Sequence, residues 1–165
     1  MKFILENLIG IVSITILTLN TIILSCLLIP LGLIKFFLPI TNIKVLFTKF
    51  IINIGELWIF TNKIWVKALH KPHWEIIGKE NIKSNGWTIA TSNHQSFADI
   101  FLLQDITNMK MPMLKFFMKY VLIYVPIIGL SWWALDMPFL KRYTKKQLEK
   151  NPKLVGKDVK EMKRA

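Results

Sequence analysis

Hydrophobic positions dominate the start of the chain, where 28 residues without a charge lie between Glu6 and Lys35. The densest part covers residues 8–29, and about 20 apolar residues are enough for a helix to cross ~30 Å of hydrocarbon. A strand of this length is improbable in a soluble domain, and in lipid a single segment satisfies its backbone only as a helix. The pattern therefore predicts a membrane helix over residues 4–29.

Helix-breaking residues come after the apolar run. Pro30, Gly32 and Pro39 predict that the first helix ends there and that a short apolar piece comes next. From Asn42 to Leu69 apolar residues then recur at helical spacing, with tryptophan and phenylalanine among them. This pattern is typical of an amphipathic helix at a membrane interface.

A secretory signal peptide is the alternative interpretation of residues 1–29. The basic Lys2 is soon offset by Glu6, and the apolar run exceeds the roughly 7–15 residues usual in a signal peptide. The residues after Cys26 stay apolar, where a mature lipoprotein becomes polar. We therefore expect an uncleaved anchor. Lysines are more frequent after the first apolar run than before it, which predicts that the rest of the chain faces the cytoplasm.

A polar stretch at His70–His73 marks the expected domain boundary. It separates membrane-associated residues 1–69 from a second domain over residues 70–165. Two short strands are predicted there, at Trp74–Ile77 and Trp87–Thr91, because both are rich in aromatic and β-branched residues.

The second domain has the pattern of the start of an α/β layer structure. A turn at Lys83–Gly86 separates the two predicted strands, and Phe97–Thr107 has the pattern of a helix. Tyr120–Leu135 is an uncharged stretch of 16 residues, short for a membrane span and interrupted by Pro126 and Gly129. We expect it to be a buried or membrane-surface segment.

Composition narrows the class of protein further. The chain is 53% hydrophobic, yet its 22 Lys+Arg against 10 Asp+Glu give a net charge of +12. Disordered tails and nucleic-acid-binding arms combine high charge with low hydrophobicity, so both are excluded. The single cysteine excludes an internal disulfide. Residues 141–165 carry 10 basic and 3 acidic residues, and a chain both apolar and basic suits a membrane with anionic lipid.

The sharpest chemical signal is the pair His94 and Asp99, spaced as H-x-x-x-x-D. Five steps along one helix would place the two side chains ~140° apart. If His94 precedes a helix and Asp99 lies in its first turn, the carboxylate can reach back to the ring. An aspartate that accepts from one ring nitrogen fixes the tautomer and leaves the other nitrogen as a base.

The sequence also allows three other interpretations of its candidate residues. Ser96 and Asp99 also fit a capping box, in which Asp99 only caps the helix. A metal site from His70, His73 and His94 is a weaker hypothesis, because two histidines flanking a proline usually lie in a polar turn. Nucleic-acid binding by the basic tail is weaker still, since no nucleic-acid-binding fold is recognisable.

Two blocks of the sequence resemble signatures of the membrane glycerolipid acyltransferases, the 1-acyl-sn-glycerol-3-phosphate acyltransferase family. Thr91–Asp99 looks like the first block. The second block is resembled by three stretches together, Phe116–Lys119, Val125–Gly129 and Ala134–Arg142. The last contains the Asp-x-Pro-Phe motif of a bacterial inner-membrane subgroup of the family. The resemblance covers roughly residues 70–165 and, more loosely, the N-terminal apolar helix.

The resemblance implies transfer of a fatty acyl group from acyl-CoA or acyl-carrier protein to the hydroxyl of lysophosphatidic acid or a related lysophospholipid. His94 matches the general base and Asp99 the carboxylate that orients it. Arg142 matches the arginine that binds the acceptor phosphate, and Lys141 and Lys119 are expected to assist. The donor is a substrate, so no cofactor or metal is implied. The expected location is the inner membrane, with membrane lipid as a further partner.

The family's third block, usually Glu-Gly-Thr-Arg, and its fourth block are not found in the sequence. We therefore expect residues 70–165 to form the N-terminal half of an acyltransferase α/β domain, behind a membrane helix and an amphipathic helix. An inactive membrane-anchored fragment of such an enzyme is the alternative.

Overall fold

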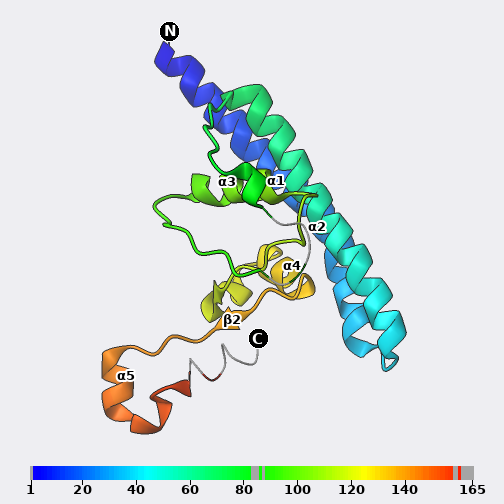
Figure 1. The fold of residues 1–165 in the computed structure, drawn as a ribbon, viewed down its shortest axis with the longest axis vertical. Helices are drawn as coiled ribbons and strands as arrows, with labels where there is room; N and C mark the ends of the chain where they lie inside the picture. The colour runs from blue at the N-terminus through cyan, green and yellow to red at the C-terminus, as the bar shows by residue number, and fades with distance from the viewer. Residues whose placement is uncertain (1, 83–85, 87, 158–159, 161–165) are drawn as a thin grey trace.

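The computed structural model describes residues 2–82, 86, 88–157 and 160. Two long helices lie side by side, elements from residues 97–134 pack along one flank of the pair, and the helix at residues 145–150 extends away from it (Figure 1). The helices and strands are α1 (Lys2–Phe37), α2 (Thr41–His70), η1 (Lys79–Asn81), α3 (Phe97–Thr107), β1 (Met118–Lys119), η2 (Tyr120–Tyr124), α4 (Ile128–Ala134), β2 (Phe139–Leu140), α5 (Lys145–Lys150) and η3 (Pro152–Leu154).

Helix α1 is longer than predicted. It is one α-helix of 36 residues with Pro30 inside it, so the prediction that the helix ends near Pro30 and Gly32 is wrong. A proline inside a helix removes one backbone hydrogen bond, and packing against neighbouring helices compensates for that loss. The helix is long and apolar enough, by length and composition, to cross a membrane. The amphipathic helix predicted from Asn42 to Leu69 is confirmed as α2.

Polar side chains join α1 to α2 along the inside of the hairpin. Near its middle, Asn20 Nδ2 donates to Asn62 Oδ1 at 2.8 Å, and Asn62 is almost fully buried. At its open end, Ser13 Oγ lies 2.8 Å from His70 Nε2. Hydrogen bonds between apolar helices fix which residues face each other, because only one register satisfies them.

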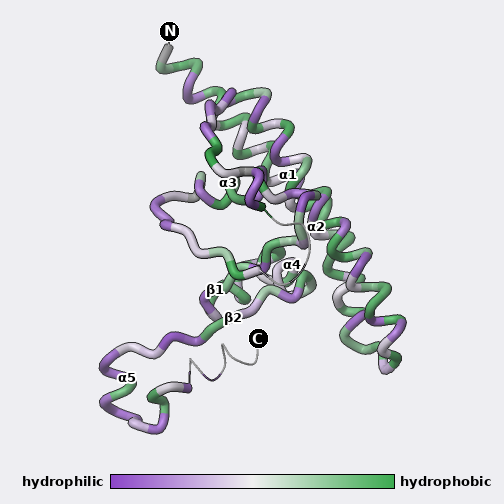
Figure 2. Tube along the Cα trace, viewed as in Figure 1, coloured by the Kyte–Doolittle hydropathy of each residue, from purple (hydrophilic) through white to green (hydrophobic). Residues whose placement is uncertain are grey.

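The outer faces of the hairpin are apolar and exposed. Figure 2 shows hydrophobic residues along both helices. Apolar surface on this scale marks contact with a membrane or another protein, because water disfavours it. On α1 the exposed apolar residues include Phe3, Ile4, Leu5, Leu8, Ile11, Ile14, Leu19, Ile23, Leu27, Leu33 and Phe37; on α2 they include Val45, Leu46, Phe50, Leu57 and Ile64.

The fold is α/β only in part. Helices dominate the described residues, and the sheet consists of β1 and β2, two residues each. The two strands are parallel, with Met118 opposite Phe139 and Lys119 opposite Leu140.

The strands predicted after the domain boundary are wrong where the structure describes them. Trp74–Ile77 and residues 88–91 are neither strand nor helix, whereas Trp87 and residues 83–85 of the predicted turn lie outside the described residues. A strand forms only where a neighbour completes its backbone hydrogen bonds. In the described part of the chain, the one strand pair is β1 with β2, so Trp74–Ile77 has no such neighbour.

The uncharged stretch Tyr120–Leu135 forms η2 and α4, and one side of α4 packs against α1. Ser131 Oγ donates to Ser25 Oγ at 2.8 Å within the buried interface. The backbones approach closely at Gly32, where an added Cβ would lie 2.5 Å from the Ala134 Cβ. Other residues of the stretch, including Leu130, are exposed. The segment therefore combines buried and surface positions.

The close approach at Gly32 gives a stability prediction. Replacing a helical glycine with alanine adds about 1 kcal/mol of helix propensity, but forcing a methyl group into a packed interface costs about 1–3 kcal/mol. A Cβ on Gly10 of the same helix meets nothing within 4 Å. We expect Gly32→Ala to be less stable than Gly10→Ala by about 1–3 kcal/mol in detergent-solubilised thermal or denaturant unfolding. Equal stabilities of the two variants would show that α4 does not pack on α1 at this position.

Candidate active site

The first candidate residues lie where an exposed loop meets α3. Residues 91–95 have no regular secondary structure, and α3 begins at Phe97 after the N-cap residue Ser96. Ser96 has the extended backbone of an N-cap, and its Oγ accepts from Ala98 N at 3.2 Å. The predicted helix Phe97–Thr107 is confirmed by α3, together with the predicted capping box.

Asp99 connects this cap to His94. Its Oδ2 accepts hydrogen bonds from the backbone N–H groups of Gln95 at 2.6 Å and Ser96 at 2.8 Å. The same oxygen lies 3.4 Å from His94 Nδ1. Asp99 is thus both the helix cap and the neighbour of the histidine ring. The two sequence interpretations of this residue therefore describe one arrangement.

The backbone donors also set the charge of Asp99. Hydrogen bonds from Ser96 and then Gln95 hold the pKa of the Asp99 carboxyl below its ordinary value; desolvation opposes them, and His94 adds a smaller lowering. The group is therefore ionised at neutral pH. An ionised carboxylate next to Nδ1 favours the tautomer that carries its proton there, which leaves Nε2 able to accept a proton. The His94 side chain is 59% exposed, so a substrate can approach it.

The second candidate group lies around the paired strands. Lys119 ends β1, and Lys141 comes directly after β2. The Lys141 Nζ lies 4.3 Å from the centre of the Tyr120 ring, close enough for a cation–π contact. Arg142 is exposed in the connection between β2 and α5. Strand pairing therefore brings the two lysines to the same end of the sheet, with Arg142 next along the chain.

The structure does not bond the two candidate groups to each other. Among the described residues, no hydrogen bond or ion pair joins His94 or Asp99 to Lys119, Lys141 or Arg142. The three basic side chains are exposed, so each is accessible to an anionic ligand. Their assignment to a phosphate remains a prediction from the resemblance.

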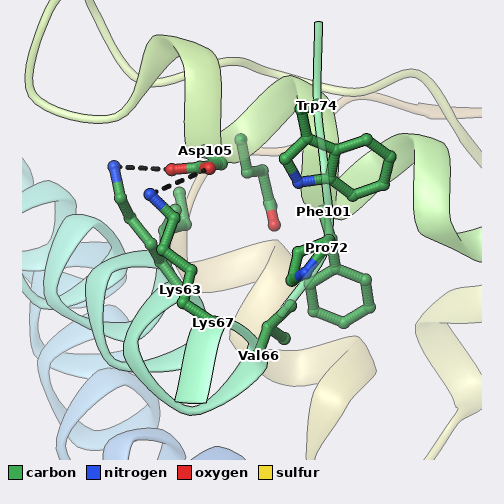
Figure 3. A pocket seen from close by; sticks show the side chains of 9 residues that line it. Lys63, Val66, Lys67, Pro72, Trp74, Phe101 and Asp105 are labelled. Atoms are coloured by element: carbon green, nitrogen blue, oxygen red, sulfur yellow. Dashed lines mark ion pairs between the residues drawn. The ribbon is translucent and has the colours of Figure 1, made fainter. Parts of the chain in front are cut away.

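A small cavity lies where α3 meets α2 (Figure 3). Its volume is about 20 Å³, which is too little for a substrate. Lys63 Nζ lies 2.5 Å from one Asp105 oxygen, and Lys67 Nζ lies 3.5 Å from the other. Trp74 and Phe101 close the apolar side. We interpret these contacts as the attachment of α3 to the hairpin. Sequence reasoning did not predict this attachment.

A wider, open groove of about 530 Å³ lies beyond the C-terminal end of α3. It is lined by Ile52, Asn53 and Glu56 of α2 and by residues 109–113. Glu56 fixes that segment, because its Oε2 accepts from the Asn108 side chain and from Met109 N. None of the predicted site residues lines this groove or the small cavity.

The metal hypothesis for the three histidines finds no support. His70 Nε2 lies against Ser13 Oγ, whereas His94 Nδ1 lies against Asp99. Within the ranges that the structure describes, no three His, Cys, Asp or Glu side chains gather as a metal site would require. His70 and His94 therefore belong to separate surroundings.

Comparison with known proteins identifies the class. The sequence profile of the acyltransferase family matches residues 73–164, which is more than half of the chain. The chain belongs to this family of glycerolipid acyltransferases, as its two blocks indicate, and His94, Asp99 and Arg142 all lie within the matched region. Searches of curated proteins and of solved structures give no match.

The lowered pKa of Asp99 predicts how stability depends on pH. A carboxyl whose pKa is lower in the folded state stabilises the fold above its ordinary pKa of about 3.9, and this contribution is lost as the pH falls through the folded value. We expect acidification below about pH 4 to lower the stability of the native chain by more than it lowers the stability of the Asp99→Asn variant. Thermal unfolding in detergent across this range measures the difference.

Ser96→Ala serves as the control, because it removes the hydroxyl cap but leaves the carboxylate in place. Its stability should fall by a similar amount at every pH. If the stability of the native chain and that of the Asp99→Asn variant depended on pH in the same way, the assigned contacts of Asp99 would be wrong.

Proposed function

We propose that the chain transfers a fatty acyl group from acyl-CoA or acyl-carrier protein to the free hydroxyl of lysophosphatidic acid or a related lysophospholipid, as a step of phospholipid synthesis. The observation that carries the proposal is the 3.4 Å approach of His94 Nδ1 to Asp99 Oδ2 at the start of α3, within the family match. The Nε2 atom of this exposed side chain is the base that such a reaction needs. The family match supports acyl transfer in general, and the specific substrates belong to the proposal.

The proposed step begins when His94 Nε2 removes the proton from the acceptor hydroxyl. The acceptor oxygen attacks the thioester carbonyl carbon, a C–O bond forms, and the C–S bond breaks after a tetrahedral intermediate. The proton then passes from the imidazolium to the departing sulfur, which leaves as a thiol. Asp99 stabilises the transient imidazolium, since it is held as a carboxylate by the two backbone N–H groups. No acyl-enzyme is formed.

The proposed acceptor site uses Arg142 with Lys141 and Lys119. The planar guanidinium of an arginine pairs with two phosphate oxygens at once, whereas a lysine supplies a single point of charge. All three side chains are exposed. They sit on or beside the strand pair, where their backbone is held by β1 and β2.

We also propose that the protein acts at the inner, cytoplasmic membrane with its catalytic part facing the cytoplasm. The apolar outer faces of α1 and α2 supply the lipid contact. Lysines after the first apolar run favour cytoplasmic retention of the segments C-terminal to it. The net charge of +12 adds attraction to anionic lipid.

The first functional prediction concerns His94. Loss of a general base lowers turnover typically by about 10²–10⁴-fold, so His94→Ala should reduce acyl transfer by this factor while membrane association persists. The assay measures transfer of a labelled acyl group from acyl-CoA, and in parallel from acyl-carrier protein, to lysophosphatidic acid by membranes that contain the chain. His73→Ala, which alters another exposed histidine, should retain activity.

Three outcomes decide between the hypotheses. Activity lost only in His94→Ala supports the catalytic assignment. Full activity in purified His94→Ala contradicts it. No activity in the native chain with either acyl donor would favour a membrane-anchored protein without turnover.

The second functional prediction concerns Arg142. A hydrogen bond to a charged group contributes about 1.5–3 kcal/mol, so Arg142→Ala should raise the acceptor KM by roughly 10–100-fold and leave the donor KM nearly unchanged. Lys150→Ala removes an exposed charge from α5 and provides the control. An equal rise in both KM values would show that Arg142 does not bind the acceptor phosphate.

A further inference from the structure

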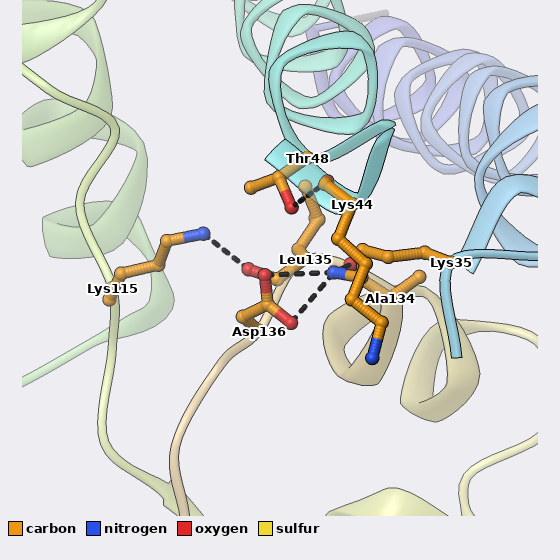
Figure 4. Close-up of polar contacts among 7 residues, drawn as sticks. All are labelled: Lys35, Lys44, Thr48, Lys115, Ala134, Leu135 and Asp136. Atoms are coloured by element: carbon orange, nitrogen blue, oxygen red, sulfur yellow. Dashed lines mark hydrogen bonds and ion pairs between the residues drawn. The ribbon is translucent and has the colours of Figure 1, made fainter. Parts of the chain in front are cut away.

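The end of α1 holds the turn between α4 and β2 (Figure 4). Lys35 Nζ donates to both carboxylate oxygens of Asp136, at 2.7 and 2.8 Å, and to the carbonyl oxygen of Ala134 at 3.0 Å. From the opposite side, Lys115 Nζ donates to the carbonyl oxygen of Leu135. We call these contacts of Lys35, Lys115, Ala134, Leu135 and Asp136 the clasp.

The clasp sits where the chain must reverse sharply. Asp136 has a φ of +54°, in the left-handed region that costs energy for any residue with a side chain. Its N–H donates to the Trp133 carbonyl, and the N–H of Met137 donates to the Trp132 carbonyl, both at 3.0 Å. The lysines meet the free carbonyls at the end of α4, where cations are favoured. The clasp thus stabilises an otherwise costly turn.

The turn determines where the next strand points. Directly after it, the carbonyl of Pro138 accepts from Met118 N at 2.8 Å, and β2 pairs with β1. Lys141 and Arg142 come after β2 without an intervening element. A change in the turn would therefore move these two side chains together.

We propose that Lys35 is a positioning residue, which through Asp136 fixes the direction of β2 and so places Arg142 and Lys141 for the phosphate of the acceptor. This inference rests on the proposed function. It makes α1 part of the acceptor site as well as a membrane helix, although Lys35 touches neither substrate nor the reacting atoms.

Asp136 is the one negative charge among the five clasp residues, and it balances the charge of the lysines around the turn. The Lys35 side chain is only 12% exposed, whereas Asp136 is 54% exposed, so the lysine is the partner that has lost most of its water. Burial lowers the pKa of Lys115, Asp136 raises it, and Lys35 lowers it further. Asp136 therefore offsets the positive charges of both Lys35 and Lys115, which would otherwise repel each other. Its loss should disturb the turn more than the loss of either lysine.

The experiment measures both KM values for Lys35→Met, Asp136→Asn and the charge exchange Lys35→Glu with Asp136→Lys. We expect Lys35→Met to raise the acceptor KM about tenfold and Asp136→Asn to raise it further. The exchange should restore part of the loss, because it renews the ion pair but not the hydrogen bond to the Ala134 carbonyl. The donor KM should stay within about twofold throughout. Lys44→Met is the matched control, because Lys44 lies beside the clasp in Figure 4 and forms no ion pair in the described structure.

A second readout does not depend on activity. Spin labels on the single cysteine, the exposed Cys26 of α1, and on Thr144→Cys report the distance from α1 to the segment after Arg142. The distance distribution should broaden in Lys35→Met and narrow again in the charge exchange. If the distribution responds in a chain without acyl transfer, the proposed function fails and the clasp stands.

The opposite result overturns the inference. An active chain whose acceptor KM and distance distribution are both unchanged in Lys35→Met would show that the clasp positions nothing. Parallel increases in both KM values, without rescue by the charge exchange, would likewise mean that Lys35 has only a general structural role.

Discussion

The inner face of α1 is the constraint on which the rest of the structure depends. Small and polar side chains recur along it, and each meets a defined partner: Asn20 meets α2, while Ser25, Gly32 and Lys35 meet α4 and the turn after it. Apolar surface alone is not directional and would let the helices slide past one another. Hydrogen bonds and the close backbone approach at Gly32 permit only one register. The shorter elements therefore have a fixed surface to pack against.

The two parts of the candidate site are attached to that hairpin at different places. Helix α3, whose first turn holds Asp99 beside His94, is held to α2 by the contacts of Asp105 with Lys63 and Lys67. Strand β2, which leads to Arg142, is held to the end of α1 through Asp136. Since no bond joins the two parts directly in the described residues, the hairpin serves as their common frame. Under the proposed function, contacts distant from the chemistry would determine where the acceptor binds.

Sequence reasoning succeeded where the physical cause is local. Helical spacing predicted α2, the capping box predicted the start of α3, and the H-x-x-x-x-D spacing predicted the reach of Asp99 to His94. All three depend on neighbours within a few residues. It failed at Trp74–Ile77, since a strand depends on a partner that composition does not reveal. It also ended α1 too early at Pro30, where packing outweighs the proline. The clasp joins residues 101 positions apart, a separation at which no single-sequence pattern operates.

The two faces of α1 are thus under separate physical requirements. The outer face needs only hydrophobicity, which many combinations of Ile, Leu and Phe provide, so substitutions among them preserve its apolar character. The inner face needs a particular atom at each position: no side chain at Gly32, a hydroxyl at Ser25 and an ammonium group at Lys35. A more hydrophobic residue at any of these three positions would strengthen partitioning into a bilayer and weaken the attachment of α4. Hydrophobicity and the packing of α4 are therefore opposed on this face, and hydropathy alone is a poor guide to which changes in α1 the fold tolerates.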